Sequence, residues 1–419
     1  INPRLKALER KSISEIAEPD LIVATDELTA GIPTDMSFEI VKISENKDKM
    51  LQELRLKAFQ SERLERNSGR PVCVCFTSGS TGTPKGALFT NKQLLAIEKM
   101  DTSGVWGSGG HLVPSTAFAH VGSMTKLPWQ LSQGVTLHIL DRWKADKVLK
   151  LVEKHQIPSI AGVSAQIALL LNVEGFKNYD FSCVKAIVAG GGPSPPSLVR
   201  KAKEGFDAPY SIRYSSTESG GIGLATSLEA SEEESLYTIG KPRPGVRAKI
   251  LNEEGQPVEA GEVGELFLKT PSAMDSYWHD ASNTEKFLND GWLKTEDLAR
   301  ENTQGFFQLA GRTSEMFIRG GYNVYPQEVE SVLNDHPKIE QLVIAPKPHP
   351  TLGEIGVAFV VPKESKDVCA LDELIEFGKE KLAGYKLPEE IKIVDELPLK
   401  NGFKIDRLLL KNICLEDAD

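Results

Sequence analysis

The side chains with the clearest potential for chemistry lie in one loop, residues 77–86, which reads TSGSTGTPKG. Small residues let backbone N–H groups approach an anion closely, while hydroxyls and a lysine add donors and positive charge. A bound polyphosphate needs this combination. The candidate phosphate-binding residues are Thr77, Ser78, Gly79, Ser80, Thr81, Gly82, Thr83 and Lys85.

This loop differs from the Walker A loop of other nucleotide-binding proteins. Walker A requires a glycine where Pro84 stands and a magnesium-binding hydroxyl where Gly86 stands. A flexible surface linker is the plain alternative. However, residues 72–76 immediately before the loop alternate with the period of a strand, and a linker does not usually follow a buried strand directly. The pattern therefore predicts a phosphate loop of another kind.

The loop resembles the phosphate-binding signature of the adenylate-forming superfamily. This group comprises acyl- and aryl-CoA synthetases, peptide-synthetase adenylation domains and firefly-type luciferases. Further segments match the family pattern in the same order, over residues 72–410: GGGP at 190–193, YSSTE at 214–218, WLKTED at 292–297, GR at 311–312, RGGYNVYP at 319–326 and LPLKNGFKID at 397–406. The closest pattern is that of the AMP-forming acyl-CoA synthetases.

The resemblance implies a nucleotide site. Tyr214 would lie against the adenine, Thr217 would donate to phosphate oxygens, and Glu218 would hold Mg²⁺ together with Thr81. An exposed loop is the alternative for residues 214–218 taken alone. The family's adenine- and acyl-pocket turn corresponds to Gly190, Gly191 and Gly192, with Ser215 in the usual place of a glycine.

The ribose would be held by a carboxylate and an arginine. Asp297 would accept hydrogen bonds from the ribose hydroxyls, and Arg312 matches the family arginine that also reaches them. A structural ion pair is the alternative for each. Glu296 replaces the usual glycine before the aspartate, which puts the shape of that loop in question.

The acyl pocket is implied around His120, Val121, Gly162 and Gly190. His120 matches a position beside the acyl carboxylate, with a purely structural histidine as the alternative. The wider set adds Phe118, Ala161, Val163, Ala189 and Ser215. These residues are mostly small and apolar, which favours a medium-chain fatty or aryl acid. Because no arginine or lysine is among them, a diacid is the less favoured substrate.

Two segments near the C-terminus would serve the two half-reactions. Lys404 matches the catalytic lysine, which stabilises the pentavalent transition state, although Phe403 replaces a glycine and the nearby Lys400 competes for the role. Gly320, Gly321 and Tyr322 match the hairpin that lines the pantetheine channel in CoA ligases. In the family the C-terminal domain rotates between half-reactions. Ser314 stands at the expected hinge, where Asp or Lys is usual.

The elements that must position these residues alternate between strands and helices, which predicts an α/β fold with largely parallel sheets. Residues 145–155 read as an amphipathic helix and 164–171 as a buried helix. From about Tyr237, short strands between turns predict a β-rich subdomain. We expect a large domain at 1–313 with the ATP and acyl site, and a small, mobile α+β domain at 314–419 with the catalytic lysine.

Composition sets further limits. A net charge of −10 argues against nucleic acid as the main partner but allows small anionic ligands. Five scattered cysteines favour core or thiol residues in a reducing compartment over a zinc site. No apolar run reaches membrane-spanning length and no signal peptide is visible, so we expect a cytoplasmic protein. The first residues, INPRLKALER, resemble an internal stretch of the family's large domain, and we expect an N-terminal segment to be missing.

The function implied by the resemblance is ATP-dependent activation of a carboxylic acid to an acyl-AMP, followed by thioester formation with CoA. Its co-substrates are ATP and CoA, and Mg²⁺ is the expected metal. Transfer to a carrier protein, a luciferase-like oxygenase and a catalytically silent adenylate-binding protein are the alternatives. The sequence leaves the oligomeric state open, a homodimer being one option.

Overall fold

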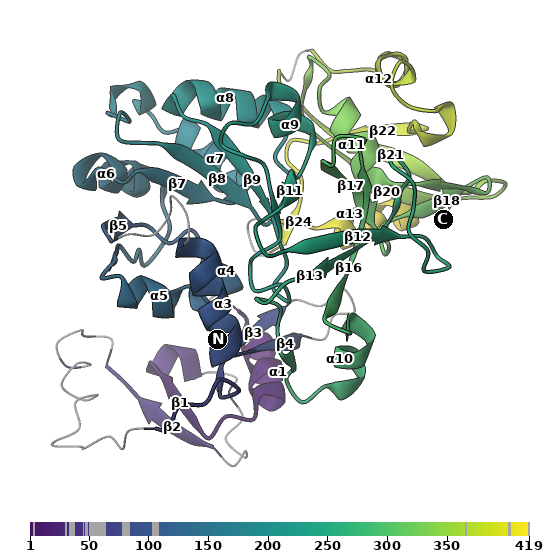
Figure 1. The fold of residues 1–419 in the computed structure, drawn as a ribbon. Helices are drawn as coiled ribbons and strands as arrows, with labels where there is room; N and C mark the ends of the chain where they lie inside the picture. The colour runs from purple at the N-terminus through teal and green to yellow at the C-terminus, as the bar shows by residue number, and fades with distance from the viewer. Residues whose placement is uncertain are drawn as a thin grey trace.

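The computed structural model describes residues 1–2, 5–29, 32, 38–44, 46, 49, 64–77, 84–102, 109–364, 367–400 and 404–417. These residues form a large α/β domain and a smaller α+β domain at the C-terminus (Figure 1). This confirms the predicted fold class. Residues 47–67 are rich in Lys, Arg and Glu, and most of them lie outside the described residues.

The centre of the large domain is a mixed sheet in the order β11-β10-β9-β8-β7. Its three longest strands run parallel: β7 (Ser159–Gly162), β8 (Ala186–Gly190) and β9 (Tyr210–Tyr214). The short β10 (Leu224–Ala225) and β11 (Lys241–Pro242) run antiparallel at one edge. Parallel strands need long crossovers, and helices supply them here.

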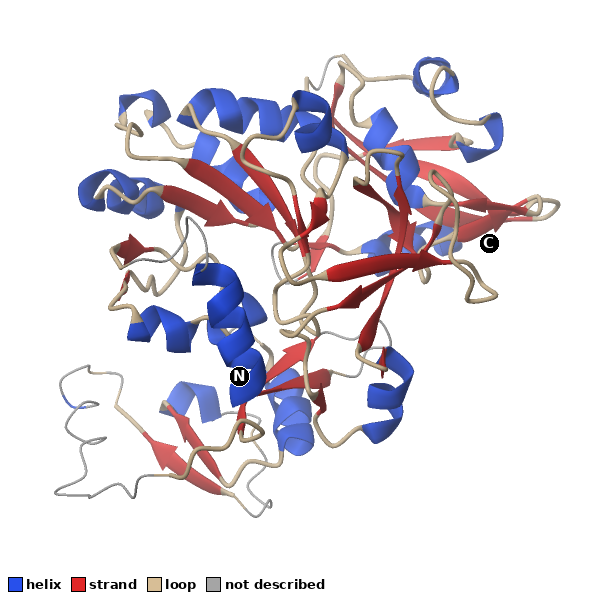
Figure 2. Cartoon of the chain, viewed as in Figure 1, coloured by secondary structure: helices blue, strands red, loops and turns tan. Residues whose placement is uncertain are grey.

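Four of the described helices lie beside this sheet (Figures 1 and 2). They are α6 (Ala145–His155), α7 (Ser164–Leu171), α8 (Pro196–Phe206) and α9 (Glu232–Tyr237). The first two have the bounds that the sequence predicts. Val148, Leu149 and Val152 of α6 are buried, because their spacing places them on one helix face.

The phosphate-loop candidate joins an antiparallel hairpin, which corrects the expectation of largely parallel sheets in this part of the chain. β3 (Pro71–Thr77) pairs with β4 (Lys85–Thr90), and β14 (Ser276–Tyr277) extends the sheet. The connection between β3 and β4 is too short for a parallel crossover. Thr77 and Lys85 are therefore directly opposite each other, at the two ends of the loop.

A second, antiparallel sheet forms the predicted β-rich subdomain. It contains β12 (Arg247–Leu251), β13 (Gly264–Lys269), β15 (Leu288–Asn289), β16 (Trp292–Glu301) and β17 (Phe307–Arg312). Helix α10 (Ala281–Phe287) precedes β15. The long strand β16 was not predicted as a strand, although it carries the motif at 292–297.

The C-terminal domain is built on a further sheet. Its strands are β18 (Phe317–Arg319), β19 (Tyr322–Val324), β20 (Ile339–His349), β21 (Gly353–Pro362) and β22 (Glu390–Ile393). The helices are α11 (Pro326–Leu333), α12 (Leu371–Lys379) and α13 (Arg407–Glu416). Two separate buried clusters pack against this sheet. The domain boundary near Ser314 falls between β17 and β18 and stays a prediction.

Two longer helices and several short elements complete the described fold. They are α1 (Ala7–Ala17), β1 (Leu21–Ala24), β2 (Glu39–Lys42), α3 (Asn91–Thr102), β5 (His111–Leu112), α4 (Val121–Met124), α5 (Leu127–Ser132), β6 (Thr136–Leu137), β23 (Leu399–Lys400) and β24 (Lys404–Ile405). Among the described residues, no helix combines the length and the apolar character needed to cross a bilayer.

Candidate functional site

One large cleft, of about 2680 Å³, holds most of the predicted site residues that the structure describes. It is lined by the ends of β8 and β9, by the segment around α4, and by β16 and β17. Residues from both domains contribute to it. The cleft is therefore shared between the large domain and the C-terminal domain.

A hydrogen-bonded group of three predicted residues lies on one wall of the cleft. The Tyr214 hydroxyl donates to Asp297 Oδ2 at 2.6 Å, and Arg312 Nε lies 2.7 Å from Asp297 Oδ1. The pairing of β16 with β17 places Asp297 opposite Arg312, so the strand register itself brings the ion pair together. Tyr214 is the last residue of β9.

The electrostatics of this group are unusual. Burial raises the pKa of Asp297 above its ordinary value, although Arg312 and the Tyr214 hydroxyl oppose that shift. Burial and the adjacent carboxylate raise the pKa of Tyr214 well above its normal range. Perturbed titratable groups in a cleft are typical of functional sites, but structural ion pairs also produce them. The structural alternative named above therefore stays open for the Asp297–Arg312 pair.

Glu296 retains the backbone shape expected of the glycine that it replaces. Its φ angle is +59°, in the left-handed region that glycine favours. Thr313 donates from both its backbone N–H and its hydroxyl to the Glu296 carbonyl, at 3.0 and 3.1 Å. The loop before Asp297 is thus held in its conformation in spite of the substitution.

Glu218 lies beside a buried tyrosine on the same cleft. The Tyr277 hydroxyl donates to Glu218 Oε1 at 2.9 Å. Burial, followed by the Glu218 charge, raises the pKa of Tyr277. The other carboxylate oxygen, Oε2, has no hydrogen bond to any residue that the structure describes. A carboxylate oxygen presented in this way suits a hard cation such as Mg²⁺.

The turn that carries Thr217 and Glu218 is held by its own serines. Ser216 and Ser219 exchange hydrogen bonds between side chain and backbone at 3.0 and 3.1 Å. Gly220 follows with a φ of +70°, and a Cβ on it would lie 2.3 Å from the Ser272 carbonyl oxygen. Thr217 and Ser215 line the cleft, as predicted.

The phosphate loop is described only at its two ends. Thr77 donates to the Lys85 carbonyl at 3.4 Å, and both residues line the cleft. Lys85 Nζ lies 4.1 Å from the centre of the Phe287 ring and 5.3 Å from that of Tyr277. The structure thus brings Lys85 near the tyrosine that binds Glu218. Ser78, Gly79, Ser80, Thr81, Gly82 and Thr83 lie outside the described residues.

The glycine turn after β8 approaches its neighbours closely. A Cβ on Gly190 would lie 2.8 Å from the Arg213 carbonyl oxygen, and Gly191 has a φ of +77°. Gly190, Gly191 and Gly192 all line the cleft. A ligand at this turn would therefore meet backbone, with no side chain in the way.

The predicted acyl-pocket residues gather at one end of the cleft. His120, Val121 and Gly162 line it, as do Phe118, Ala161 and Val163. His120 precedes α4, and its Nε2 lies 3.5 Å from Asn2 Nδ2. Ala189 is fully buried in the core and does not line the cleft, so its inclusion in the wider pocket set was wrong.

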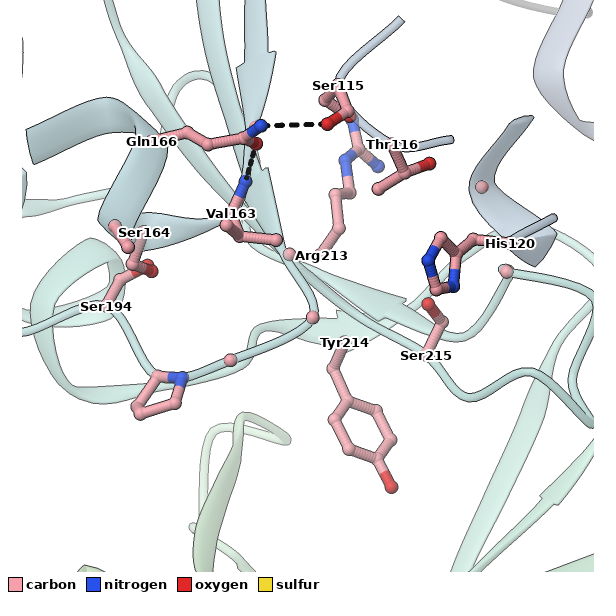
Figure 3. A pocket seen from close by; sticks show the side chains of 18 of the residues that line it. Ser115, Thr116, His120, Val163, Ser164, Gln166, Ser194, Arg213, Tyr214 and Ser215 are labelled. Carbon is pink, nitrogen blue, oxygen red and sulfur yellow. Dashed lines mark hydrogen bonds between the residues drawn. The ribbon is translucent and has the colours of Figure 1, made fainter. Parts of the chain in front are cut away.

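Two polar residues at this end were missed. Gln166, in the first turn of α7, accepts from the Val163 N–H at 3.0 Å and donates to the Ser115 carbonyl at 2.8 Å (Figure 3). Arg213 extends from β9 and lines the same cleft as Thr116 and His120 (Figure 3). Arg213 directly precedes Tyr214 of the YSSTE segment, and this position next to a predicted site motif could have identified it from the sequence.

Arg213 belongs to a group with excess positive charge. Asp101 is bonded to Lys126 and lies 3.2 Å from Arg243, and all three line the cleft. The Arg213 side chain makes no hydrogen bond or ion pair with any described residue. Burial, followed by the Arg243 charge, lowers the pKa of Arg213 to about 10. The group therefore has three cations and one carboxylate, and could accept an anion.

The residues predicted for the second half-reaction are placed elsewhere. Gly320, Gly321 and Tyr322 lie in the β18–β19 hairpin and do not line the cleft. The Tyr322 ring stacks on Tyr385 at 4.7 Å between ring centres.

The predicted catalytic lysine, Lys404, begins β24, whose first residue pairs with Lys400 of β23. The neighbouring Leu399 and Ile405 line the cleft, so this segment faces the site.

Comparison with known proteins supports the resemblance. The family model "AMP-binding enzyme" matches residues 1–278, and "AMP-binding enzyme C-terminal domain" matches 328–404. The chain is 31% identical to 2-succinylbenzoate–CoA ligase of Bacillus subtilis over 391 residues, covering 90% of this chain and 77% of that one. It is 30% identical to indoleacetate–CoA ligase of Aromatoleum aromaticum over 78% of this chain. This chain spans 64% of the length of that second relative, under two thirds.

A solved structure agrees over almost the whole chain. It is the o-succinylbenzoate CoA synthetase of Bacillus subtilis in complex with its acyl-adenylate intermediate. The TM-score is 0.81 at 27% identity, with 98% of this chain and 82% of that chain covered. The matches of fold, family model and motif order agree with one another. The chain belongs to the AMP-binding enzyme family, within the adenylate-forming superfamily.

Proposed function

We propose that this protein activates a carboxylic acid with ATP, forming an acyl-AMP and releasing pyrophosphate, and then transfers the acyl group to CoA. The observation that carries the proposal is the bonded group Tyr214–Asp297–Arg312 in one cleft with Glu218. An aromatic face, a buried carboxylate and a second carboxylate with a free oxygen match the needs of adenine, ribose and a metal-bound phosphate.

In this proposal each group has a defined task. Asp297 accepts from the ribose hydroxyls, and the Tyr214 ring lies against the adenine. The loop at 77–86, including Lys85, holds the β- and γ-phosphates. Glu218 and Thr81 would hold Mg²⁺, which neutralises phosphate charge when bound. Lys404 then stabilises the negative charge that develops as the carboxylate attacks the α-phosphorus.

CoA is the proposed acceptor. The names of the two relatives described above both specify CoA. The β18–β19 hairpin with Gly320, Gly321 and Tyr322 is the element that we assign to the pantetheine arm. Because it lies outside the cleft, this assignment requires the C-terminal domain to turn before the thiol attacks. A carrier protein as acceptor remains the alternative to test.

The acid itself is proposed to carry a second anionic group. The predicted pocket residues include no cation, which on sequence alone makes a diacid the less favoured substrate. Arg213 supplies such a cation, with no hydrogen-bonded or ion-paired carboxylate among the described residues and next to the positive charge of Arg243, although the Asp101 charge also acts on it. A carboxylate there would form a charge-assisted pair in a partly desolvated place, where such pairs are strong. Fatty and aryl monoacids are the competing substrates.

The test is acid-dependent ATP–pyrophosphate exchange across pairs of monoacids and diacids of equal length, such as hexanoate and adipate. We expect exchange with diacids. Arg213→Gln should lower kcat/KM for the diacid by about 10- to 100-fold, the range for a hydrogen bond to a charged group, and spare the monoacid. Lys126 is a poor control because it is bonded to the buried Asp101. Lys201→Gln is the charge control, since Lys201 is an exposed cleft residue whose ion pair with Glu340, at 3.9 Å, is also exposed.

The outcomes separate the two parts of the proposal. Exchange with monoacids only would overturn the role of Arg213 and leave adenylation intact. No exchange with any acid, while ATP still binds, would overturn adenylation itself. When exchange is found, addition of CoA or of a phosphopantetheinylated carrier protein identifies the acceptor by the thioester that accumulates.

A further inference from the structure

Three of the seven histidines of the chain meet at one place outside the groups described above. His111 begins β5, His138 directly follows β6, and His155 ends α6. One ligand nitrogen from each ring lies within 4.8 Å of those from the other two. We propose that His111, His138 and His155 form a binding site for a divalent transition-metal ion, with Zn²⁺ as the metal of choice.

The ring geometry supports this proposal. His111 Nδ1 and His138 Nε2 lie 2.8 Å apart, and the three ring centres are separated by 5.0, 4.6 and 4.3 Å. Zinc–nitrogen bonds of about 2.0–2.1 Å in a tetrahedral site place the nitrogens about 3.4 Å apart. Movements of about an ångström, within reach of side-chain rotation, would therefore create three ligand bonds.

The backbone that carries the histidines is held by strand pairing and helix packing. β5 and β6 pair in parallel with His111 opposite Thr136, and the His138 N–H donates to the Leu112 carbonyl at 2.8 Å. His155 sits on the last turn of α6, whose apolar face is buried. Ligands carried by strands and helices are positioned more reproducibly than ligands carried by loops.

The chemistry of the donors selects the ion. All three are imidazoles, which suit Zn²⁺, Cu²⁺ and Ni²⁺, whereas Mg²⁺ and Ca²⁺ prefer oxygen. Imidazole binds a metal ion through an unprotonated ring nitrogen, and Lys154 adjoins His155 in the last turn of α6. Lys154 is also the charge that opposes a bound cation. Three histidines leave a fourth position for water.

The location suggests what the ion would do. His111 lines the cleft, and so do Leu112–Ser115, Ile139–Asp141 and Pro158, which follow the three histidines along the chain. An ion bonded to all three would fix three segments of the wall near the proposed acyl end. Its expected effect is metal-linked stabilisation of that wall, distinct from the Mg²⁺ proposed at Glu218.

The test measures metal binding on the whole chain after chelator treatment, without ATP. We expect one Zn²⁺ per chain in competition with a chromogenic chelator, and visible absorption of four-coordinate type with Co²⁺. His138→Gln and His155→Gln should each weaken Zn²⁺ binding by about 10-fold or more. Zn²⁺ should raise the Tm of the wild type by about 3 °C at saturation, and that of the variants by less.

Two other histidines serve as controls. His279 is exposed and has a φ of +54°, so His279→Asn keeps a residue that tolerates this conformation. His336→Gln tests the second grouping of possible ligands, His336, Cys369 and Glu373. Equal Tm values without metal would show that all variants fold.

Two results would overturn the proposal. One is equal Zn²⁺ affinity in the wild type and in both His138→Gln and His155→Gln. The other is loss of the zinc through His336→Gln, which would assign the metal to the C-terminal domain. Neither readout uses the adenylation reaction, so the answer is independent of the proposed function.

Discussion

Replacing Tyr214 with phenylalanine removes one hydroxyl from the most buried part of the candidate site and leaves the ring in place. That hydroxyl donates to Asp297 at 2.6 Å, and the two residues are only 9% and 7% exposed. A hydrogen bond to a charged group contributes about 1.5–3 kcal/mol. Since Arg312 still holds the other carboxylate oxygen, we expect Tyr214→Phe to lower the free energy of unfolding by about 2 kcal/mol.

The unfolding of the large domain can be followed separately from that of the C-terminal domain. All five tryptophans precede residue 313, so tryptophan fluorescence in urea reports the unfolding of that part of the chain. A double-mutant cycle with Asp297→Asn then separates the Tyr214–Asp297 interaction from the other effects of each change. We expect a coupling energy of about 1–2 kcal/mol, and weaker ATP binding in every variant that lacks the carboxylate.

The pH dependence gives a second, independent readout. Burial raises the folded-state pKa of Asp297, and the Tyr214 hydroxyl opposes that rise. Tyr214→Phe therefore raises the folded pKa further, while the unfolded pKa stays the same. At a pH below the unfolded pKa of about 3.9, Asp297 is protonated in both states, and the free-energy cost of burying its charge vanishes. This cost grows as the pH rises from the unfolded pKa through the folded pKa. The deficit of the variant should thus be larger at pH 8 than near the unfolded pKa, at about pH 4.

The reasoning would be refuted by a coupling energy that cannot be distinguished from zero. A deficit that stays constant between about pH 4 and pH 8 would refute the charge-dependent part alone. Thr295→Ser, which keeps the hydroxyl that accepts from the Asp297 N–H at 3.1 Å, is a matched control from the same strand.

Three further predictions concern single positions. Asp101→Asn leaves two partly buried cations without their buried anion and should lower the free energy of unfolding by about 3 kcal/mol. Because the pKa of Asp101 is lowered, this difference should shrink as the pH falls through its folded-state pKa. Gly220→Ala places a Cβ 2.3 Å from the Ser272 carbonyl oxygen at a positive φ, and a drop of several degrees in Tm would show it, whereas an unchanged Tm would contradict the packing described here. Lys404→Ala should slow adenylation by about 10²- to 10³-fold with ATP affinity retained, measured by pyrophosphate exchange, while Lys400→Ala has little effect; the reverse result would move the role to Lys400.

Local patterns in the sequence were sufficient for elements whose cause is local. The helices at 145–155 and 164–171 have the predicted bounds, because apolar spacing and end signals act over a few residues. The motif order likewise identified the family, since each motif is a short contiguous segment. Strand β16 was missed because its residues were interpreted as a ribose motif, and a strand is defined by partners distant in sequence.

Contacts between distant segments required the tertiary structure. The sequence placed Tyr214, Asp297 and Arg312 in one site by resemblance, but only the strand register and the end of β9 show that they are bonded to one another. Arg213 was overlooked because its significance depends on its lacking an ion-paired carboxylate in the part of the chain that the structure describes, which no local pattern reveals. The same holds for His111, His138 and His155, whose spacings of 27 and 17 residues follow no ligand motif. Side-chain chemistry can be read from sequence, whereas proximity depends on how the strands and helices pack, because that alone brings distant residues within bonding distance.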